Sequence, residues 1–314
     1  MPRKILVVVG PTASGKTKLS VELALRHNGE VVSADSMQIY RTMNIGTAKP
    51  TPEEMKGVPH HMLDVARPEE DFSVARYVEM ASTCIDDILA RGKLPILAGG
   101  TGLYIDSLLS GRTFAAFRPE SDLRARLQQQ FAREGGAAMW QQLQQIDPEA
   151  AQRLHPNDEK RIIRALEVWY QTGKTISQHN RETQAIPPRY DALTIGLSFR
   201  DRADMWERID RRVDVMMEQG LVDEVKMLLD RGVPAGCTSM QAIGYKEMVQ
   251  AVSTGGDVLA AAEEVKLRSR QYAKRQLTWF RRNQATRWHQ WGKEPDFMQA
   301  LLTSTEFMKE AGLV

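Results

Sequence analysis

Cysteines, long apolar runs and net charge are all scarce in this sequence. The two cysteines, Cys84 and Cys237, lie far apart without a C-x-x-C spacing, so we expect neither a disulfide framework nor a cysteine-based zinc site. The adjacent His60 and His61 have no third ligand nearby, and we expect them to serve packing or a loop. The first apolar run, residues 5–9, is too short for a signal peptide or a membrane span, and no later run approaches membrane length. These absences predict a protein of the reducing cytoplasm.

The first motif that carries chemistry follows this apolar run. Residues 10–17, GPTASGKT, have the G-x-x-x-x-G-K-T spacing of a phosphate-binding loop. The run at 5–9 fits a buried parallel strand and a helix begins near Lys16, so backbone N–H groups and the helix N-terminus would face anionic oxygens. Lys16 would reach the terminal phosphates, and the Thr17 hydroxyl would bind Mg²⁺. The motif alone does not name the owner of the phosphate. The predicted phosphate-binding residues are Gly10, Pro11, Thr12, Ala13, Ser14, Gly15, Lys16 and Thr17.

The order of elements predicts an α/β fold: a P-loop-type parallel sheet flanked by helices, with a helical insertion domain and a helical C-terminal region. With 314 residues and 42% hydrophobic content, the chain can bury one large core or two smaller ones. From residue 203 onward we expect mainly helices, one of them capped at its C-terminus by Gly220. The expected P-loop core with its C-terminal helices is 1–111 and 191–314, and the expected insertion is 112–190. The expected strands are 4–9, 30–34, 94–100 and 192–199, and the expected early helices are 16–27 and 73–90.

The net charge of +2 hides one strongly basic segment. Residues 266–287 contain eight Lys or Arg residues and no Asp or Glu, so the rest of the chain carries a net charge of −6. Lys266, Arg270 and Lys274 repeat at i, i+4, which predicts one stripe along a helix. Aromatic residues interleave with the segment, and this combination suits a nucleic-acid backbone with unstacked bases. The alternative is a solvated helix whose aromatic side chains face the core.

An acid follows the second expected strand. Asp35 would lie at the carboxyl edge of the sheet, where parallel α/β folds bind ligands, and therefore near the phosphate loop. It could hold Mg²⁺ through water, accept a proton from an incoming nucleophile or cap a turn. The strand at 94–100 ends instead in Gly99, Gly100 and Thr101, without the acid that ATPases usually place there. This difference favours transfer to a bound acceptor over simple hydrolysis.

Eight motifs occur along the chain in a fixed order. GPTASGKT at 10–17, SADSMQIYRTMNIGTAKP at 33–50, VPHHMLD at 58–64 and LAGGTGLY at 97–104 are followed by HPND at 155–158, RIIRALEV at 161–168, MQAIGYKE at 240–247 and KRQLTWFRR at 274–282. Together they resemble the tRNA dimethylallyltransferase family over nearly the whole chain. Eukaryotic relatives carry a C-terminal zinc finger that this sequence does not have, so we expect the bacterial form.

The resemblance implies that the phosphate belongs to dimethylallyl diphosphate and that the acceptor is N6 of adenine 37, beside the tRNA anticodon. The products would be N6-dimethylallyladenosine and pyrophosphate, and ATP is not implied. Asp35 would act as the general base, while Thr101 and Arg212 would contact the diphosphate or its bridging oxygen. Mg²⁺ on Thr17 would be the cofactor. The enzyme would be a cytoplasmic monomer that binds the tRNA anticodon stem-loop and no membrane.

The resemblance also implies where the tRNA binds. The helical insertion would clasp the anticodon arm from one side, the basic helix at 274–282 would grip the other side, and the residues after Asp35 would recognise an adenine that has left its stack. The implied tRNA-binding residues are Asp35, Ser36, Met37, Gln38, Thr101, Lys160, Arg161, Arg164, Gln241, Gly244, Tyr245, Lys274, Arg275, Gln276, Trp279 and Arg281.

Three alternative functions stay open at this point. An adenylate dimethylallyltransferase would prenylate free AMP or ATP with a similar core, but it would need neither an acid-free basic segment nor a large helical insertion. A nucleoside or nucleotide kinase would hold ATP in the phosphate loop. A non-catalytic RNA-binding module would have no use for the intact Lys16, Thr17 and Asp35.

Overall fold

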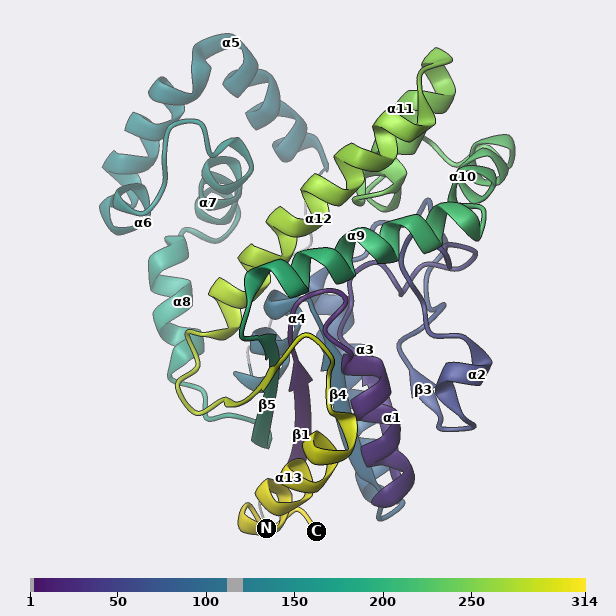
Figure 1. Ribbon diagram of the computed structural model, residues 1–314. Coiled ribbons are helices and arrows are strands. Elements are labelled where there is room, and N and C mark those ends of the chain that lie inside the picture. The colour runs from purple at the N-terminus through teal and green to yellow at the C-terminus, as the bar shows by residue number, and fades with distance from the viewer. Residues whose placement is uncertain (1–2, 112–120) are drawn as a thin grey trace. The chain divides into compact units, whose positions relative to one another are not determined.

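The central element of the fold is a parallel sheet. The computed structural model describes residues 3–111 and 121–314, so the first residues of the expected insertion, 112–120, lie outside the described part. The sheet has the strand order β3-β2-β4-β1-β5-β6, with every neighbouring pair parallel (Figure 1). The predicted fold class is confirmed. The strands are β1 Lys4–Val9, β2 Gly29–Ser33, β3 His60–His61, β4 Leu94–Gly99, β5 Asp191–Phe199 and β6 Arg287–Trp291.

The inner strands carry aliphatic side chains that are buried on both faces of the sheet. In β1, KILVVV, every residue after the first is buried, as expected for a parallel strand covered by helices on both sides. The register pairs Val9 with Gly99 of β4 and with Gly196 of β5. It also pairs Ser33 of β2 with Ala98 of β4. The carboxyl ends of these four strands therefore reach one edge of the sheet, where ligands bind in such folds.

The helices of the larger of the chain's two compact units cover the two faces of this sheet or pack beside it. They are α1 Lys16–Arg26, α2 Pro52–Met55, α3 Val74–Ala90, α4 Gly102–Leu109, α9 Arg202–Glu218, α10 Leu221–Asp230, the 3-10 helix η1 Ser239–Gln241, α11 Tyr245–Thr254, α12 Val258–Phe280 and α13 Phe297–Glu310. Leu19 of α1, Ile209 of α9 and Ala300 of α13 belong to the apolar cluster on one face. Ile85 of α3 and Ile105 of α4 belong to the cluster on the other face. Among the described residues, no helix is both long and apolar enough to cross a membrane.

A third apolar cluster fixes the segment that follows β2. Ile39 and Met43 of this segment are buried together with Leu221 of α10 and Met248 of α11. The segment passes from the carboxyl edge of the sheet, so α10 and α11 support the residues next to Asp35 from outside the sheet.

The chain divides into two compact units, one made of residues 1–109 and 189–314 and the other of residues 110–188. The second unit contains α5 Ser121–Ile146, α6 Pro148–Gln152, α7 Glu159–Thr172 and α8 Ile176–Gln184. Its own core includes Leu143 of α5 and Leu166 of α7, both fully buried. Gly135 has non-helical dihedral angles, so α5 consists of two helical segments that meet there.

The chain after residue 203 is mainly helical, as predicted, but it also contains a strand that the sequence did not predict: residues 287–291 form β6, which pairs in parallel with β5. The predicted cap at Gly220 is one residue from the C-cap of α9, which ends at Glu218 with Gln219 as its cap. Gly220 follows that cap in a left-handed conformation with φ 96°, in which glycine commonly ends a helix, and it precedes α10 directly.

Candidate active site

The phosphate loop joins β1 to α1 and keeps its anion-binding groups available. Gly15 has φ 89°, and a Cβ atom there would lie 2.6 Å from the ring of Phe297, so the conformation and the space both require glycine. The next residue, Lys16, begins α1, whose first N–H groups have no partner within the helix. Ser14 Oγ is buried and has no hydrogen-bond partner in the described part of the chain. These features fit a loop that binds an anionic ligand.

Side chains from three distant elements hold the loop from outside. Arg208 of α9, Gln276 of α12 and Trp291 of β6 each make a hydrogen bond to its backbone, and Lys16 makes a fourth from within. The donors, acceptors and distances are Arg208 Nε to Ala13 O at 3.4 Å, Thr12 N to Gln276 Oε1 at 2.9 Å, Trp291 Nε1 to Ser14 O at 2.9 Å, and Lys16 Nζ to Pro11 O at 2.7 Å.

Asp35 lies two residues after the end of β2, and backbone N–H groups hold its carboxylate. Its Oδ1 accepts hydrogen bonds from the backbone N–H groups of Met37 at 2.9 Å and Gln38 at 3.4 Å. This is the turn contact that the sequence offered as one alternative. The contact holds the carboxylate at the carboxyl edge of the sheet.

Thr101 ties the end of β4 to the end of β2. Its Oγ1 accepts a hydrogen bond from Ser36 N at 3.0 Å, and its backbone N–H donates to Ala34 O at 3.0 Å. Gly99 permits this approach, because a Cβ atom there would lie 2.2 Å from the carbonyl oxygen of Ala34. Asp35 and Thr101, predicted separately from two strand ends, are therefore brought together.

Two cationic side chains complete this edge of the sheet. Burial and the positive charge of Arg212 together lower the pKa of Lys16 to about 8, although the negative charge of Asp35 opposes the shift. Burial also lowers the pKa of Arg212, against the charges of Glu54 and Asp35. Lys16, Asp35 and Arg212 thus lie close enough to act on one another. Two partly desolvated cations beside one carboxylate suit a ligand that carries several negative charges.

Two residues at this edge were not predicted from the sequence. Burial and the charge of Asp35 raise the pKa of Tyr272 of α12 to about 12, although a hydrogen bond with Thr101 opposes the rise. Tyr272 therefore lies with the predicted site residues. Arg208 contacts the phosphate loop from α9, one helical turn before Arg212. The i, i+4 spacing of the two arginines on one helix face was the signal that could have identified Arg208.

Several predicted tRNA-binding side chains contact the protein itself. Gln276 is buried and joins Thr12 N to Gly100 O, the latter at 2.9 Å. Tyr245 is fully buried and donates to Glu224 Oε1 at 2.6 Å. In this conformation both side chains hold protein segments, and their contact with tRNA stays a prediction. Gln38 Nε2 donates to the carbonyl oxygens of residues 47 and 48, whereas Gln241, at the end of η1, is exposed.

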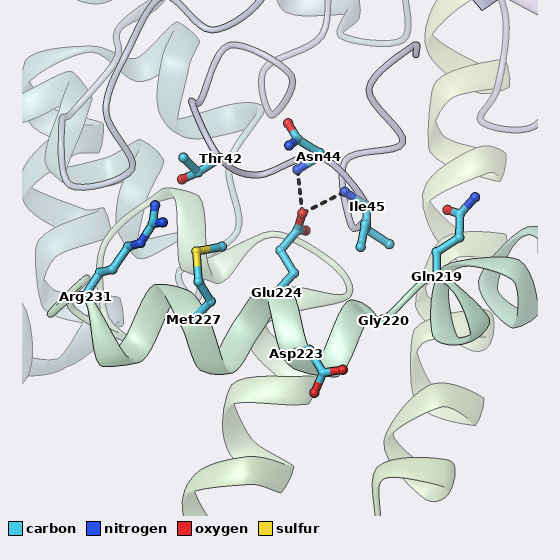
Figure 2. Close-up of a pocket in the computed structure, with 9 residues that line it drawn as sticks. All are labelled: Thr42, Asn44, Ile45, Gln219, Gly220, Asp223, Glu224, Met227 and Arg231. Atoms are coloured by element: carbon cyan, nitrogen blue, oxygen red, sulfur yellow. Dashed lines mark hydrogen bonds between the residues drawn. The ribbon is translucent and has the colours of Figure 1, made fainter. Parts of the chain in front are cut away.

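Glu224 anchors the loop on which Gln38 rests. Its carboxylate accepts hydrogen bonds from the backbone N–H groups of Asn44, Ile45 and Gly46 at 2.8–3.1 Å. Figure 2 shows this carboxylate rising from α10 toward Asn44 and Ile45 in a shallow pocket of about 430 Å³. None of the pocket-lining residues is a predicted site residue, so the pocket is separate from the phosphate loop and Asp35.

The basic stripe of α12 is corrected by its contacts with α9. Lys266 Nζ lies 2.6 Å from Asp214, and Arg270 Nη1 lies 2.6 Å from each carboxylate oxygen of Asp210. Two of the three stripe residues therefore join α12 to α9, because two acids spaced i, i+4 on α9 match two bases spaced i, i+4 on α12. The stripe as a whole does not form a free cationic surface.

The later part of the basic segment is open to solvent. Lys274, Arg275 and Arg281 are exposed and form no ion pair with any residue that the structure describes. Trp279 is partly exposed and donates to Asp106 Oδ2 at 2.8 Å. The guanidinium of Arg282 lies 4.9 Å from the centre of the Trp279 ring. The cations that remain available are thus concentrated at the C-terminal end of α12.

The predicted cations of the helical unit lie on α7. Lys160 and Arg161 are exposed, and Arg161 lies 3.6 Å from Asp158. Arg164 is partly buried and lies 3.0 Å from the fully buried Glu167, which Arg124 also contacts at 2.7 Å. Arg164 therefore also serves the fold of its own unit.

The donor set beside the phosphate loop fits Mg²⁺ only together with ligand oxygens. Thr17 offers one hydroxyl and Asp35 one carboxylate. In residues 3–111 and 121–314 no group of three or more His, Cys, Asp and Glu side chains could hold a metal. Mg²⁺ commonly keeps waters and uses substrate phosphates with one or two protein oxygens, which agrees with this set. His61 Nε2 lies 2.8 Å from a carboxylate oxygen of the buried Glu30.

A parallel α/β sheet, a phosphate loop after β1 and an acid after β2 at the same edge of the sheet define a P-loop protein built to bind a phosphorylated ligand beside a carboxylate. The family model described as IPP transferase matches residues 38–283. A protein of Acetivibrio thermocellus named tRNA dimethylallyltransferase is 47% identical over 284 residues, 90% of each chain, and one of Caldanaerobacter subterraneus subsp. tengcongensis with the same name is 48% identical over 289 residues, 92% of each chain. This chain belongs to the IPP transferase family.

Solved structures support the same assignment. The full-length tRNA isopentenylpyrophosphate transferase of Bacillus halodurans is 42% identical, with a TM-score of 0.73, and the match covers 99% of this chain and 98% of that one. A eukaryotic dimethylallyltransferase described as acting on tRNA is 30% identical, with a TM-score of 0.83, over 98% of this chain and 80% of that one. The predicted family is confirmed.

Proposed function

We infer that this chain is an enzyme that transfers a dimethylallyl group from dimethylallyl diphosphate to N6 of adenine 37 of tRNA and releases pyrophosphate. The observation that carries the proposal is the position of Asp35, held beside the phosphate loop and joined through Ser36 to Thr101 at the end of β4. β4 brings no second acid to this edge. The names and similarity of the relatives support the substrate pair.

The phosphate loop and two cations bind the diphosphate in this proposal. Free N–H groups at the start of α1 donate to its oxygens, and Lys16 and Arg212 balance its charge. The Thr101 hydroxyl lies beside Asp35 and contacts the bridging oxygen. Thr17 would hold Mg²⁺ together with diphosphate oxygens, and the ion would neutralise part of the negative charge that develops on the leaving group.

Asp35 performs the proton transfer. The exocyclic amine of adenine is a weak nucleophile because its lone pair is delocalised into the ring. As N6 forms its bond to the allylic carbon, the carbon–oxygen bond to the diphosphate breaks and its electron pair leaves with pyrophosphate. The N6 proton passes to the carboxylate of Asp35. Lys16 and Arg212 thus stabilise the diphosphate that leaves the allylic carbon, while the carboxylate of Asp35 accepts the proton of the N6 that attacks it.

The tRNA must present adenine outside its stack, which costs a few kcal/mol. Contacts to the RNA backbone offset this cost: in the proposal they come from the exposed cations of α7 and from the C-terminal end of α12. In the proposal, the extruded adenine and its neighbours are contacted by the three residues that follow Asp35, namely Ser36, Met37 and Gln38. A single chain supplies all of these groups, so we propose that the enzyme acts as a monomer, and its tRNA substrate places it in the cytoplasm.

Assays that combine each possible group donor with each possible acceptor distinguish this function from its alternatives. The enzyme is incubated with Mg²⁺, with either dimethylallyl diphosphate or ATP, and with tRNA, AMP or a nucleoside, and product masses are measured. We expect a prenylated product only with tRNA and dimethylallyl diphosphate. Prenylated AMP would assign the chain to adenylate transfer, and phosphate transfer from ATP would assign it to the kinases.

The affinity for pyrophosphate is expected to depend on pH through Lys16. The pKa of Lys16 in the protein without ligand is lowered to about 8. Because a bound diphosphate favours the charged form of Lys16, binding above that pH requires the uptake of a proton. The contribution of Lys16 should therefore not change with pH below about 7, and the affinity should fall by up to about tenfold per pH unit above pH about 8. Calorimetry on the protein and on Lys16→Met checks this, and equal pH dependence in both would contradict it.

The exposed cations of α12 are expected to set the salt dependence of tRNA binding. Each phosphate contact releases counterions, so each lost contact should lower the slope of log affinity against log salt by roughly 0.7–0.9. Replacing Lys274, Arg275 and Arg281 together by Gln should weaken all substrate tRNAs about equally and leave the choice of adenine unchanged.

A triple variant of equal charge provides the control. Lys56, Lys293 and Lys309 are exposed cations on other elements, and their replacement by Gln should leave the salt slope close to that of the unaltered protein. An unchanged slope in the α12 variant, measured by tRNA affinity at several salt concentrations, would show that these side chains do not contact the RNA backbone.

A further inference from the structure

The last strand and helix of the chain pack directly on the phosphate loop. Trp291, at the end of β6, donates its indole N–H to Ser14 O at 2.9 Å, and both residues are almost completely buried. Phe297, the first residue of α13, fills the space beside Gly15. The rings of Trp291 and Phe297 lie 5.2 Å apart. This segment lies beyond residues 38–283, which the family model matches.

The hydrogen bond from Trp291 fixes the orientation of one peptide group of the loop. The Ser14–Gly15 peptide bond is trans, so its C=O and N–H point in opposite directions. Since the carbonyl oxygen points to the indole, the N–H of Gly15 points away from Trp291. This N–H donates to no acceptor among the described residues, so it is available to an anion.

We propose that Trp291 is a positioning residue for the diphosphate: it holds the Ser14–Gly15 peptide so that the N–H of Gly15 faces the bound phosphate oxygens. The proposal rests on the diphosphate site of the proposed function. Without the indole N–H, the Ser14–Gly15 peptide can rotate, and the N–H of Gly15 is no longer fixed before the ligand arrives. Binding must then also order the loop, which weakens the affinity.

The same strand offers a matched control. Trp288 lies three residues earlier, and its ring packs against Gly196 of β5, where a Cβ atom would lie 2.5 Å from it. Its indole makes no hydrogen bond to a described residue. Trp288 thus contributes packing from the same strand on the other face of the sheet, whereas Trp291 contributes both packing and a hydrogen bond to the loop.

The test compares Trp291→Phe with Trp288→Phe. We expect Trp291→Phe to raise the Kd for inorganic pyrophosphate with Mg²⁺ and the KM for dimethylallyl diphosphate by about 3- to 10-fold, as the loss of one hydrogen bond predicts. The KM for tRNA should stay unchanged. Trp288→Phe should lower the melting temperature but bind pyrophosphate with the affinity of the unaltered protein.

A second variant removes only the donor. Replacing Trp291 by β-(3-benzothienyl)alanine keeps the shape of the indole and exchanges its N–H for sulfur, so a similar loss of pyrophosphate affinity is expected with little change in melting temperature. Unchanged affinity in both Trp291 variants would overturn the proposal and leave Trp291 a packing residue. If the unaltered protein itself did not bind pyrophosphate, the proposed function and this inference would both fail.

Discussion

Replacing Asp35 by Ala or Asn is expected to lower the turnover of prenyl transfer by about 10²- to 10⁴-fold, the usual contribution of a general base. The two variants separate two roles of the side chain. Asn retains an Oδ1 that can accept the backbone N–H groups of Met37 and Gln38, and therefore keeps the turn, but it cannot take up the N6 proton. Ala loses both the turn contact and the base.

Similar losses of kcat in both variants would mean that proton transfer carries the effect. tRNA affinity should change far less than kcat, because Asp35 makes no phosphate contact in the proposed mechanism. The measurement is single-turnover prenylation of tRNA at saturating dimethylallyl diphosphate. Near-normal turnover in Asp35→Asn would remove the base role and leave Asp35 as a residue that shapes the turn.

The second large effect is expected at Lys16. Replacing it by Ala should lower kcat/KM for dimethylallyl diphosphate by about 10²- to 10³-fold, the usual effect of removing one group that stabilises charge in the transition state. The reason is that the diphosphate leaves with additional negative charge, and Lys16 and Arg212 are partly buried cations at this edge of the sheet. The KM for tRNA should change little.

Arg26→Ala provides the matched control for Lys16. Arg26 is an exposed cation in the last turn of the same helix. Its replacement therefore removes one positive charge from α1 at the end that is far from the phosphate loop. Steady-state kinetics with each substrate varied in turn distinguishes the two variants. Loss of the same size in Arg26→Ala, or retained use of dimethylallyl diphosphate in Lys16→Ala, would contradict the assignment of Lys16 to the diphosphate.

The parts of the site that the sequence predicted well are those that follow from strand ends. A buried apolar run followed by G-x-x-x-x-G-K-T specifies a strand, a loop and a helix locally, and the carboxyl ends of parallel strands meet at one edge. Asp35 and Thr101 could therefore be placed near the loop, although more than sixty residues separate them, and the structure joins them through Ser36.

The contacts that the sequence could not predict depend on how distant elements pack. Strand β6, RWHQW, lies at the edge of the sheet and is mostly half-buried, so it lacks the apolar pattern of β1 and β4. Nothing local shows that Trp291 reaches Ser14. The basic stripe failed for the same reason, because Arg270 meets Asp210, 60 residues earlier, only after α9 and α12 have packed.

The number of charged residues in segment 266–287 does not show which of its cations are available to RNA. Asp214 and Asp210, which pair with Lys266 and Arg270, are on α9, and Glu263, which also pairs with Lys266, lies on α12 just before the segment, so a count within the segment misses these acids. Exposure together with the absence of an ion pair to any described residue, and not the count, indicates that Lys274, Arg275 and Arg281 can meet a tRNA backbone.

The most direct test of the central claim is to locate the modification. Unmodified tRNA with adenine at position 37 is incubated with the enzyme, Mg²⁺ and dimethylallyl diphosphate, then digested, and the fragments are analysed by mass spectrometry. The account predicts one added dimethylallyl group on N6 of adenine 37, release of one pyrophosphate per group, and no addition when position 37 is guanine. Modification at another nucleotide, or phosphate transfer from ATP without any prenylated product, would contradict it.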